Sequence, residues 1–251
     1  TNRYFVEYSE DVSDEAAENA WLINTFTVNN MLSLGKERLS GRVSVEDIPS
    51  GHRHLTSIME AMTENCEIII GYRKYTSDQT SSYTIRPYAV KEFAKRWYIV
   101  GHCVERNGTR VYGLDRIMNL EITDRKFKMP KDFDVDELFA KSFGIYIPEE
   151  KGRTIVFRTT RKEANFLRDL PIHPSQRELS IKEVRRHFPS VSPVTEDAYF
   201  EIFVCPNDAL IMEFCKHGDR LEVLAPEPIR RSVASELLKA ASQYEPYQPK
   251  P

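Results

Sequence analysis

Apolar residues in the first quarter of the chain change their spacing from strand-like to helical. Alternating apolar and polar residues predict a strand over residues 3–8. Ser13 then precedes two acidic residues, as at a helix N-terminus, and apolar residues beyond it keep helical spacing up to Gly35. The same spacing returns over residues 55–62 and predicts a short amphipathic helix. Residues 1–65 are therefore expected to form a helical connector.

Strand-like spacing dominates the next part of the chain. The expected strands are short and joined by turns, and they cover residues 67–72, 83–88, 97–102, 110–114 and 117–124. A polar hairpin loop is expected over residues 76–82, and a tight turn over residues 106–109. Because a flat sheet of this size could not bury both faces, the pattern favours a small barrel or a strongly curled sheet in residues 66–128.

The remaining residues combine both kinds of spacing. Residues 129–151 are expected to form a linker with one short helix that ends near Gly144. In residues 152–251 the expected strands cover 154–159, 177–184, 199–204 and 220–224, and the expected helices cover 161–170, 208–216 and 229–244. The order β-α-β-β-α-β-α is typical of a ferredoxin-like domain, an antiparallel sheet covered by two helices. The predicted fold class is α+β.

Composition agrees with a folded protein of two compact domains. The chain has 251 residues, of which 41% are hydrophobic and 29% charged. Its apolar runs are far shorter than the ~20 residues that cross a bilayer, and no signal segment opens the chain, so we expect no membrane partner and a cytoplasmic location. Four scattered cysteines without a C-x-x-C pair fit buried thiols better than disulfides or a zinc site. Thr1 is not an initiator methionine, so the chain is expected to be part of a longer protein.

Charge is distributed unevenly along the chain. The formal net charge is -3, but residues 1–60 carry five basic and ten acidic side chains, whereas residues 85–126 carry nine basic and five acidic ones. The predicted barrel is therefore the basic part of the chain. A modest excess of this kind is most often a solvated face, and it becomes informative only beside other features.

The usual signatures of catalysis are absent from the sequence. It contains no G-x-x-x-x-G-K-S/T, no G-x-G-x-x-G and no G-x-S-x-G, so the common phosphate loops and the nucleophile elbow are missing. His52 and His54 lack the spacing of helical metal ligands. We therefore expect no enzyme activity, no metal and no cofactor.

Arginines stand beside aromatic residues on neighbouring predicted strands. Three segments show this, namely 86–88 (Arg-Pro-Tyr), 96–98 (Arg-Trp-Tyr) and 110–116. Guanidinium groups bind phosphate in a bidentate way and aromatic rings stack on bases, so a strand face with both can hold a nucleotide or a nucleic-acid single strand. Trp97 and Tyr98 point to opposite faces of their strand, so one of these two faces is core.

At these residues the sequence resembles the WYL-domain transcriptional regulators of bacteria. The matching segments are 85–90 (Ile-Arg-Pro-Tyr-Ala-Val), 96–101 (Arg-Trp-Tyr-Ile-Val-Gly) and 110–117 (Arg-Val-Tyr-Gly-Leu-Asp-Arg-Ile), followed by Phe127 and Pro130. Ile99 stands where the family usually has Leu, a conservative departure. Residues 170–176 and 218–226 are similar to the C-terminal extension of the family, the WCX domain.

The resemblance implies an Sm-like barrel with a basic face that binds an effector. It also implies a winged helix-turn-helix upstream of this chain, so that operator DNA would be bound only through that missing domain. By motif, Arg110 and Arg116 are the leading anion contacts, and Trp97 is a core anchor. The other residues implied in the ligand site are Arg86, Tyr88, Arg96, Tyr98, His102 and Tyr112.

The leading hypothesis is therefore the ligand-sensing part of a bacterial transcriptional regulator. Its effector would be a single-stranded nucleic acid or a nucleotide-like molecule, and a homodimer would transmit binding to the DNA-reading domains. The connector and the closing helix offer apolar area for dimer contacts. A protein-interaction scaffold without a nucleic-acid ligand is the main alternative. A metal-dependent nuclease that uses Asp115 or Glu121 is a further one.

Overall fold

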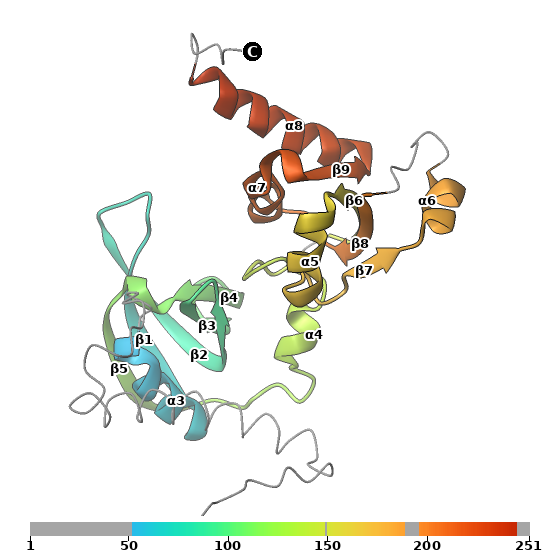
Figure 1. The fold of residues 1–251 in the computed structure, drawn as a ribbon. Helices are drawn as coiled ribbons and strands as arrows, with labels where there is room; N and C mark the ends of the chain where they lie inside the picture. The colour runs from blue at the N-terminus through green and yellow to red at the C-terminus, as the bar shows by residue number, and fades with distance from the viewer. Residues whose placement is uncertain (1–51, 149, 189–195, 245–251) are drawn as a thin grey trace, which may run out of the picture. The chain divides into compact units, whose positions relative to one another are not determined.

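The computed structural model describes residues 52–148, 150–188 and 196–244 (Figure 1). The chain divides into two units between Ile48 and Pro49, and every described residue belongs to the second. The predicted strand over 3–8 and the predicted helices before Gly35 lie outside the described residues. Two antiparallel sheets and their helices give a mixed α+β fold, as predicted. Among the described residues, no helix is long and apolar enough to cross a membrane.

Five strands form the first sheet, and their positions confirm the sequence prediction to within a few residues at each end. They are β1 (Cys66–Arg73), β2 (Thr80–Phe93), β3 (Arg96–Cys103), β4 (Gly108–Gly113) and β5 (Ile117–Lys126). The strand order is β4-β3-β2-β1-β5, and all neighbours are antiparallel. No pairing joins β4 to β5 in the described part of the chain, so hydrogen bonds do not close a barrel.

A bulge divides β2 into two halves whose side chains alternate in opposite phase. The register with β3 shifts between Pro87 and Ala89, which leaves Tyr88 as the extra residue. Before the bulge, Ile85 is buried in the core of the sheet, and after it Val90 packs against the same core. Odd-numbered residues therefore face this core in the first half of β2, and even-numbered residues face it in the second half.

Helices cover both faces of the first sheet. On one face, α3 (Leu55–Thr63) buries the apolar stripe predicted from its spacing (Figure 1). On the opposite face, α4 (Val135–Phe139) ends in Phe139, which packs with Ala89 and Val100. The two helices cover the apolar part of each face without hydrogen-bonded closure, while Arg86 on the second face stays partly exposed.

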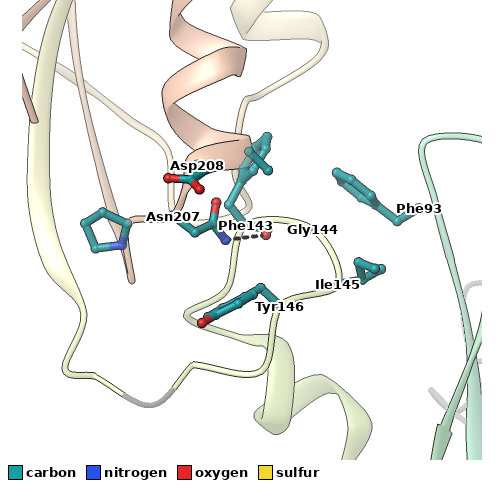
Figure 2. Close-up of a pocket in the computed structure, with 9 residues that line it drawn as sticks. Phe93, Phe143, Gly144, Ile145, Tyr146, Asn207 and Asp208 are labelled. Atoms are coloured by element: carbon teal, nitrogen blue, oxygen red, sulfur yellow. Dashed lines mark hydrogen bonds between the residues drawn. The ribbon is translucent and has the colours of Figure 1, made fainter. Parts of the chain in front are cut away.

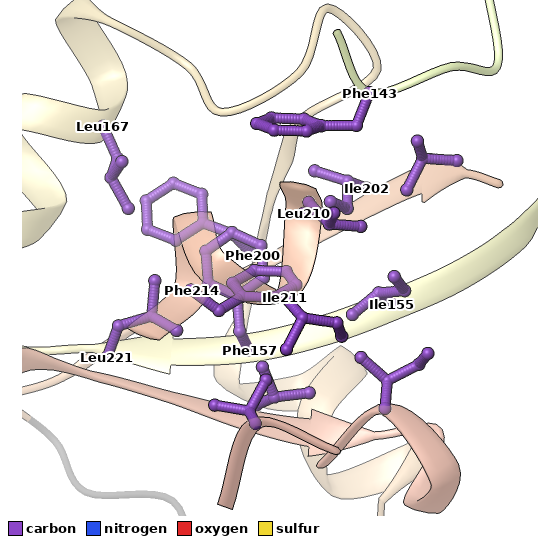
Figure 3. Close-up of a cluster of buried hydrophobic side chains, with 14 of the residues drawn as sticks. Phe143, Ile155, Phe157, Leu167, Phe200, Ile202, Leu210, Ile211, Phe214 and Leu221 are labelled. Atoms are coloured by element: carbon purple, nitrogen blue, oxygen red, sulfur yellow. The ribbon is translucent and has the colours of Figure 1, made fainter. Parts of the chain in front are cut away.

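The second sheet has four strands in the order β7-β8-β6-β9, all antiparallel. The strands are β6 (Arg153–Thr159), β7 (Arg177–Leu179), β8 (Ala198–Val204) and β9 (Leu221–Ala225). The helices α5 (Arg161–Asp169), α7 (Asp208–Lys216) and α8 (Glu227–Ser242) pack on one face of this sheet. Their apolar residues meet the rings of Phe157 and Phe200 in a single core (Figure 3).

One element of the second domain differs from the sequence prediction. The strand predicted over residues 177–184 ends at Leu179, and α6 (Ile181–His187) follows. The Ser180 hydroxyl accepts the Glu183 backbone N–H at 3.3 Å, and the Glu183 carboxylate accepts the Ser180 backbone N–H at 2.8 Å. This capping box satisfies backbone donors that only a helix start leaves free, and it turns the chain out of the sheet.

Replacing the capping serine tests this explanation. We expect Ser180→Ala to lower the free energy of unfolding by about 1 kcal/mol, because the Glu183 amide loses its acceptor. Urea denaturation followed by circular dichroism measures the change. Ser235→Ala is the matched control, since Ser235 is exposed on α8 and makes no side-chain hydrogen bond within the described segments. An equal effect of both substitutions would contradict the role of the cap.

Candidate functional site

Three tyrosines and two arginines form a continuous row on the α3 side of the first sheet. In order of contact its members are Arg116, Tyr72, Tyr112, Tyr83 and Arg106. The two arginines lie over the terminal rings, with guanidinium carbons 4.9 Å and 4.8 Å from the ring centres of Tyr72 and Tyr83. The Tyr112 ring lies 5.0 Å from that of Tyr72 and 5.5 Å from that of Tyr83. We call these five residues the arginine–tyrosine row.

The row exists because the sheet is strongly curled. β1 and β4 are separated by two strands, which in a flat sheet would place them roughly 14 Å apart. The rings of Tyr72 and Tyr112 nevertheless touch at 5.0 Å. The backbone N–H of Gly113 also donates to the Tyr72 hydroxyl at 3.3 Å. Curling therefore brings the inner faces of two non-neighbouring strands together.

The tyrosines of the row are buried, and only its ends reach the surface. Between 3% and 8% of each tyrosine is exposed. Burial raises the pKa of Tyr72 and of Tyr112. Burial is the largest single influence on Tyr83 and acts to raise its pKa, but hydrogen bonds from Arg106, at 2.8 Å, and Ser81, together with the charges of Arg106 and Lys74, lower this pKa on balance. The rings thus act as a fixed support that holds an arginine at each end.

The Arg116 end combines two cations with an exposed ring. Tyr75, in the loop between β1 and β2, is 70% exposed, and its ring centre lies 4.4 Å from the Arg116 guanidinium. Asp115 accepts a hydrogen bond from Arg96 at 2.8 Å and a longer one from the Tyr75 hydroxyl at 3.4 Å. The buried Nε of Arg116 has no hydrogen-bond partner among the described residues. This end can bind an anion and stack on a flat ring.

Several residues predicted from the sequence meet at the same end. Arg96 and Arg116 flank Asp115, and Tyr98 lies beside Arg96. Burial raises the pKa of Tyr98, although the Arg96 charge opposes it. Trp97 is buried in the core, so its prediction as a core anchor is confirmed.

Arg110 lies apart from this group, toward the Arg106 end. It stands two residues before Tyr112 on β4 and therefore on the same side of the strand. Its side chain is exposed, and one Nη donates to the Thr109 carbonyl oxygen at 2.8 Å. Arg110 is thus an exposed cation whose side chain is held by one backbone carbonyl oxygen.

Arg86 and His102 occupy the opposite face of the sheet. They are Cα partners across β2 and β3, and Arg86 follows the core residue Ile85 directly. Tyr88 packs at 5.1 Å against Phe133 of the linker. The structure therefore divides the predicted ligand residues between two faces, whereas the sequence analysis placed them in one groove.

Four members of the site were not proposed from the sequence as ligand residues. Tyr72 and Tyr83 stood out only as strand residues, Arg106 was placed in a turn and Tyr75 was unmarked. The alternation of β1 and β2 does put Tyr72 and Tyr83 on the core face. Their contact with Tyr112 depends on which side chains the curl of the sheet brings together, and the sequence pattern does not specify these pairs.

Outside the arginine–tyrosine row, the described residues form a pocket but no cluster of metal ligands. No group of three His, Cys, Asp or Glu side chains among them is placed to hold a metal ion. A largely apolar pocket lies where the linker turn of Phe143–Tyr146 meets the start of α7 (Figure 2). There the Asn207 amide donates to the Phe143 carbonyl oxygen at 3.0 Å, and Asp208 is the only acidic residue that lines the pocket.

Comparisons with known proteins agree with the first sheet as a unit. The family model of the WYL domain matches residues 53–122. A structure of proteasome accessory factor B/C (PafBC) of Arthrobacter aurescens is 20% identical, with a TM-score of 0.34, and the match covers 83% of this chain and 30% of that one. A crystal structure of a CRISPR Cas-related protein is 15% identical, with a TM-score of 0.43, and the match covers 75% of this chain and 50% of that one. The chain thus spans half or less of each structure. No curated protein matches it.

Proposed function

Because residues 53–122 form a WYL domain, we propose that this chain is the ligand-sensing part of a bacterial transcriptional regulator. Its effector is a single-stranded nucleic acid or a nucleotide-like molecule that binds at the ends of the arginine–tyrosine row, where Arg106 and Arg116 reach the surface. The observation that carries this proposal is the placement of one arginine at each end of a buried tyrosine support.

The chemistry of the row supports a phosphate-bearing ligand with a base. Arg106 and Arg116 are held against ring faces rather than against carboxylates, so their charges are not neutralised within the row. Guanidinium groups fixed in this way are suited to bidentate phosphate contacts. The exposed ring of Tyr75 offers a surface on which a base can stack.

The finer fold assignments belong to the same proposal. The curl of the first sheet supports an Sm-like barrel in residues 66–128, after a connector over 1–65. The strand order of the second sheet supports a ferredoxin-like WCX domain in residues 152–251, joined by the linker 129–151.

Transmission to DNA requires a partner and an upstream domain. We assign homodimer contacts to the C-terminal domain, where Leu238 on α8 is 71% exposed. Operator DNA would be read by a winged helix-turn-helix outside this chain. Binding of the effector can shift such a dimer only through different affinities for its two arrangements.

Removing both ends of the row tests the proposal. We expect Arg106→Ala combined with Arg116→Ala to weaken binding of a short labelled DNA or RNA single strand about 100-fold, because two charge-assisted phosphate contacts are lost. The slope of log K against log salt should fall by about 1.4. Fluorescence anisotropy over a potassium chloride series measures both quantities.

A control variant that also loses two positive charges separates an effect of the proposed site on binding from an effect of net charge. Arg161→Ala with Lys162→Ala removes two exposed cations from α5. This variant should bind as the unmodified protein does. Equal losses in the two double variants would show non-specific attraction and contradict the assignment. Absence of any binding, together with a tightly bound partner protein, would favour the scaffold alternative.

A further inference from the structure

A buried glutamate on the opposite face of the first sheet holds two arginines from the flanking strands. Glu67 of β1 has a carboxylate only 9% exposed. One oxygen accepts the Nε–H of Arg86 on β2 at 2.9 Å, and the other accepts the Nε–H of Arg125 on β5 at 2.9 Å. Since β1 lies between β2 and β5, one acid orients a cation on each side of its own strand.

The strand register places a fourth residue in line with these three on the same face of the sheet. Ile68 and Ile85 are Cα partners, so Glu67 and Arg86 stand at the next level on the opposite face. His102 on β3 is the Cα partner of Arg86. Four adjacent strands, β5, β1, β2 and β3, thus each place one polar residue on this face, in the order Arg125, Glu67, Arg86 and His102.

The two arginines keep a net positive charge and several N–H groups that make no hydrogen bond to Glu67. Two guanidinium groups share one carboxylate, which gives a local excess of one positive charge. Each arginine donates only its Nε–H to Glu67, and neither guanidinium group makes another hydrogen bond within the described part of the chain. Their side chains are 40% and 60% exposed, so the remaining N–H groups are within reach of solvent. An Nε bond to a buried acid also fixes the plane of each guanidinium before a ligand arrives.

We propose that Arg86 and Arg125, held in place by Glu67, form a second anion site that takes a phosphate group. It lies on the face of the sheet opposite the arginine–tyrosine row and is independent of it. Phosphate oxygens accept hydrogen bonds from an Nη of each arginine, and His102 lies beside Arg86 on the neighbouring strand. Glu67 is a positioning residue that does not itself contact the anion.

The test follows backbone amide resonances of β1, β2 and β5 by NMR during titration with inorganic pyrophosphate at constant ionic strength. We expect saturable shifts in the unmodified chain and about tenfold weaker binding in Arg125→Ala. A second titration with oligothymidylate that lacks terminal phosphates separates the sources. Shifts with pyrophosphate alone identify a free or terminal phosphate, and shifts with both identify the nucleic-acid backbone as a ligand.

Glu67→Gln distinguishes positioning from simple attraction. This variant keeps the shape of the side chain and raises the local positive charge. If Glu67 orients the arginines, pyrophosphate binding weakens about threefold despite the added charge. Stronger binding in Glu67→Gln, unchanged binding in Arg125→Ala or the absence of saturable shifts would overturn the proposal.

The two sites fail separately. Arg106→Ala with Arg116→Ala should leave the pyrophosphate shifts on β1, β2 and β5 intact, because both substitutions are on the other face. Loss of those shifts in this variant would overturn the second site without affecting the proposed function. A urea denaturation curve for Arg125→Ala that matches the curve of the unmodified chain confirms that the variant remains folded.

Discussion

Phe157→Ala is expected to lower the free energy of unfolding by about 3–5 kcal/mol, because it opens a cavity at the centre of the second domain. Phe157 is 0% exposed. Its ring stacks at 5.7 Å on Phe200 of β8 and lies 5.6 Å from Phe214 of α7 (Figure 3). The substitution therefore removes the contact that joins the middle of the sheet to its covering helix. Urea denaturation followed by circular dichroism measures the loss.

Phe166 provides a matched control on the same domain. Its ring is 57% exposed on α5, so Phe166→Ala removes little packing and should cost well under 1 kcal/mol. Similar losses for the two phenylalanines would show that the second domain is not organised around the core described.

The second large effect concerns a buried histidine that joins α5 to α7. The side chains of His217 and Glu163 are each 7% exposed, and Nδ1 of the histidine lies 2.7 Å from a Glu163 oxygen. Nε2 lies 3.7 Å from Glu213. Arg220 approaches the other Glu163 oxygen at 3.1 Å, and Lys216 pairs with Glu213 at 2.6 Å. An imidazolium, with a proton on each nitrogen, suits both carboxylates.

The pH dependence of stability follows from this geometry. The Glu213 carboxylate, opposed by burial and aided by Glu163, raises the pKa of His217 above its ordinary value of 6.5. The contribution of His217 is therefore fully present below about pH 6.5 and is lost as the pH rises through the raised pKa. We expect the unfolding free energy to fall as the pH rises above about 6.5 and through the raised pKa of His217. Urea titrations across this window measure it.

Two variants isolate the histidine. His217→Ala should lower the unfolding free energy at pH 6.5 by about 3–5 kcal/mol, because Glu163 keeps its burial and loses one of its two cationic partners. It should also flatten the decline above about pH 6.5. Glu163→Gln should reduce the decline and keep the ring. A wild-type slope in His217→Ala would contradict the assignment. Below pH 6.5, His173 also contributes to the pH dependence of the unfolding free energy, because burial lowers its pKa.

Local patterns in the sequence predicted most of the elements. Alternation located the five strands of the first sheet, and the spacing of apolar residues located α3, α5, α7 and α8. Capping chemistry was also present in the sequence at Ser180 and Glu183, but a continuous run of alternating residues concealed it. The helix replaced a strand there because satisfied backbone donors outweigh a weak strand pattern.

The candidate site was only partly predictable. Arginines next to aromatic residues marked Arg96 and Arg116, whose guanidinium groups lie over the Tyr75 ring, and Arg110, which is exposed. The strand pattern favoured a barrel or a strongly curled sheet, but the ring contacts made by the curl and the bulge in β2 were not predicted. Curling brought Tyr72 to Tyr112 across two intervening strands. The bulge in β2 also changed the face of every residue after it, so parity counted along the sequence could not assign both halves of the strand.

The bulge at Tyr88 also determines where this domain can change length. Removing Tyr88 would make Pro87 and Ala89 successive partners of Gly101 and Val100, so Val90 would still face the core and Lys91 would stay over the Phe139 ring on the other face. Residues added to the loop between β1 and β2 leave the facing of every strand residue unchanged. β2 can thus lose one residue at the bulge, and the loop before it can gain residues, without a change in which side chains face the core.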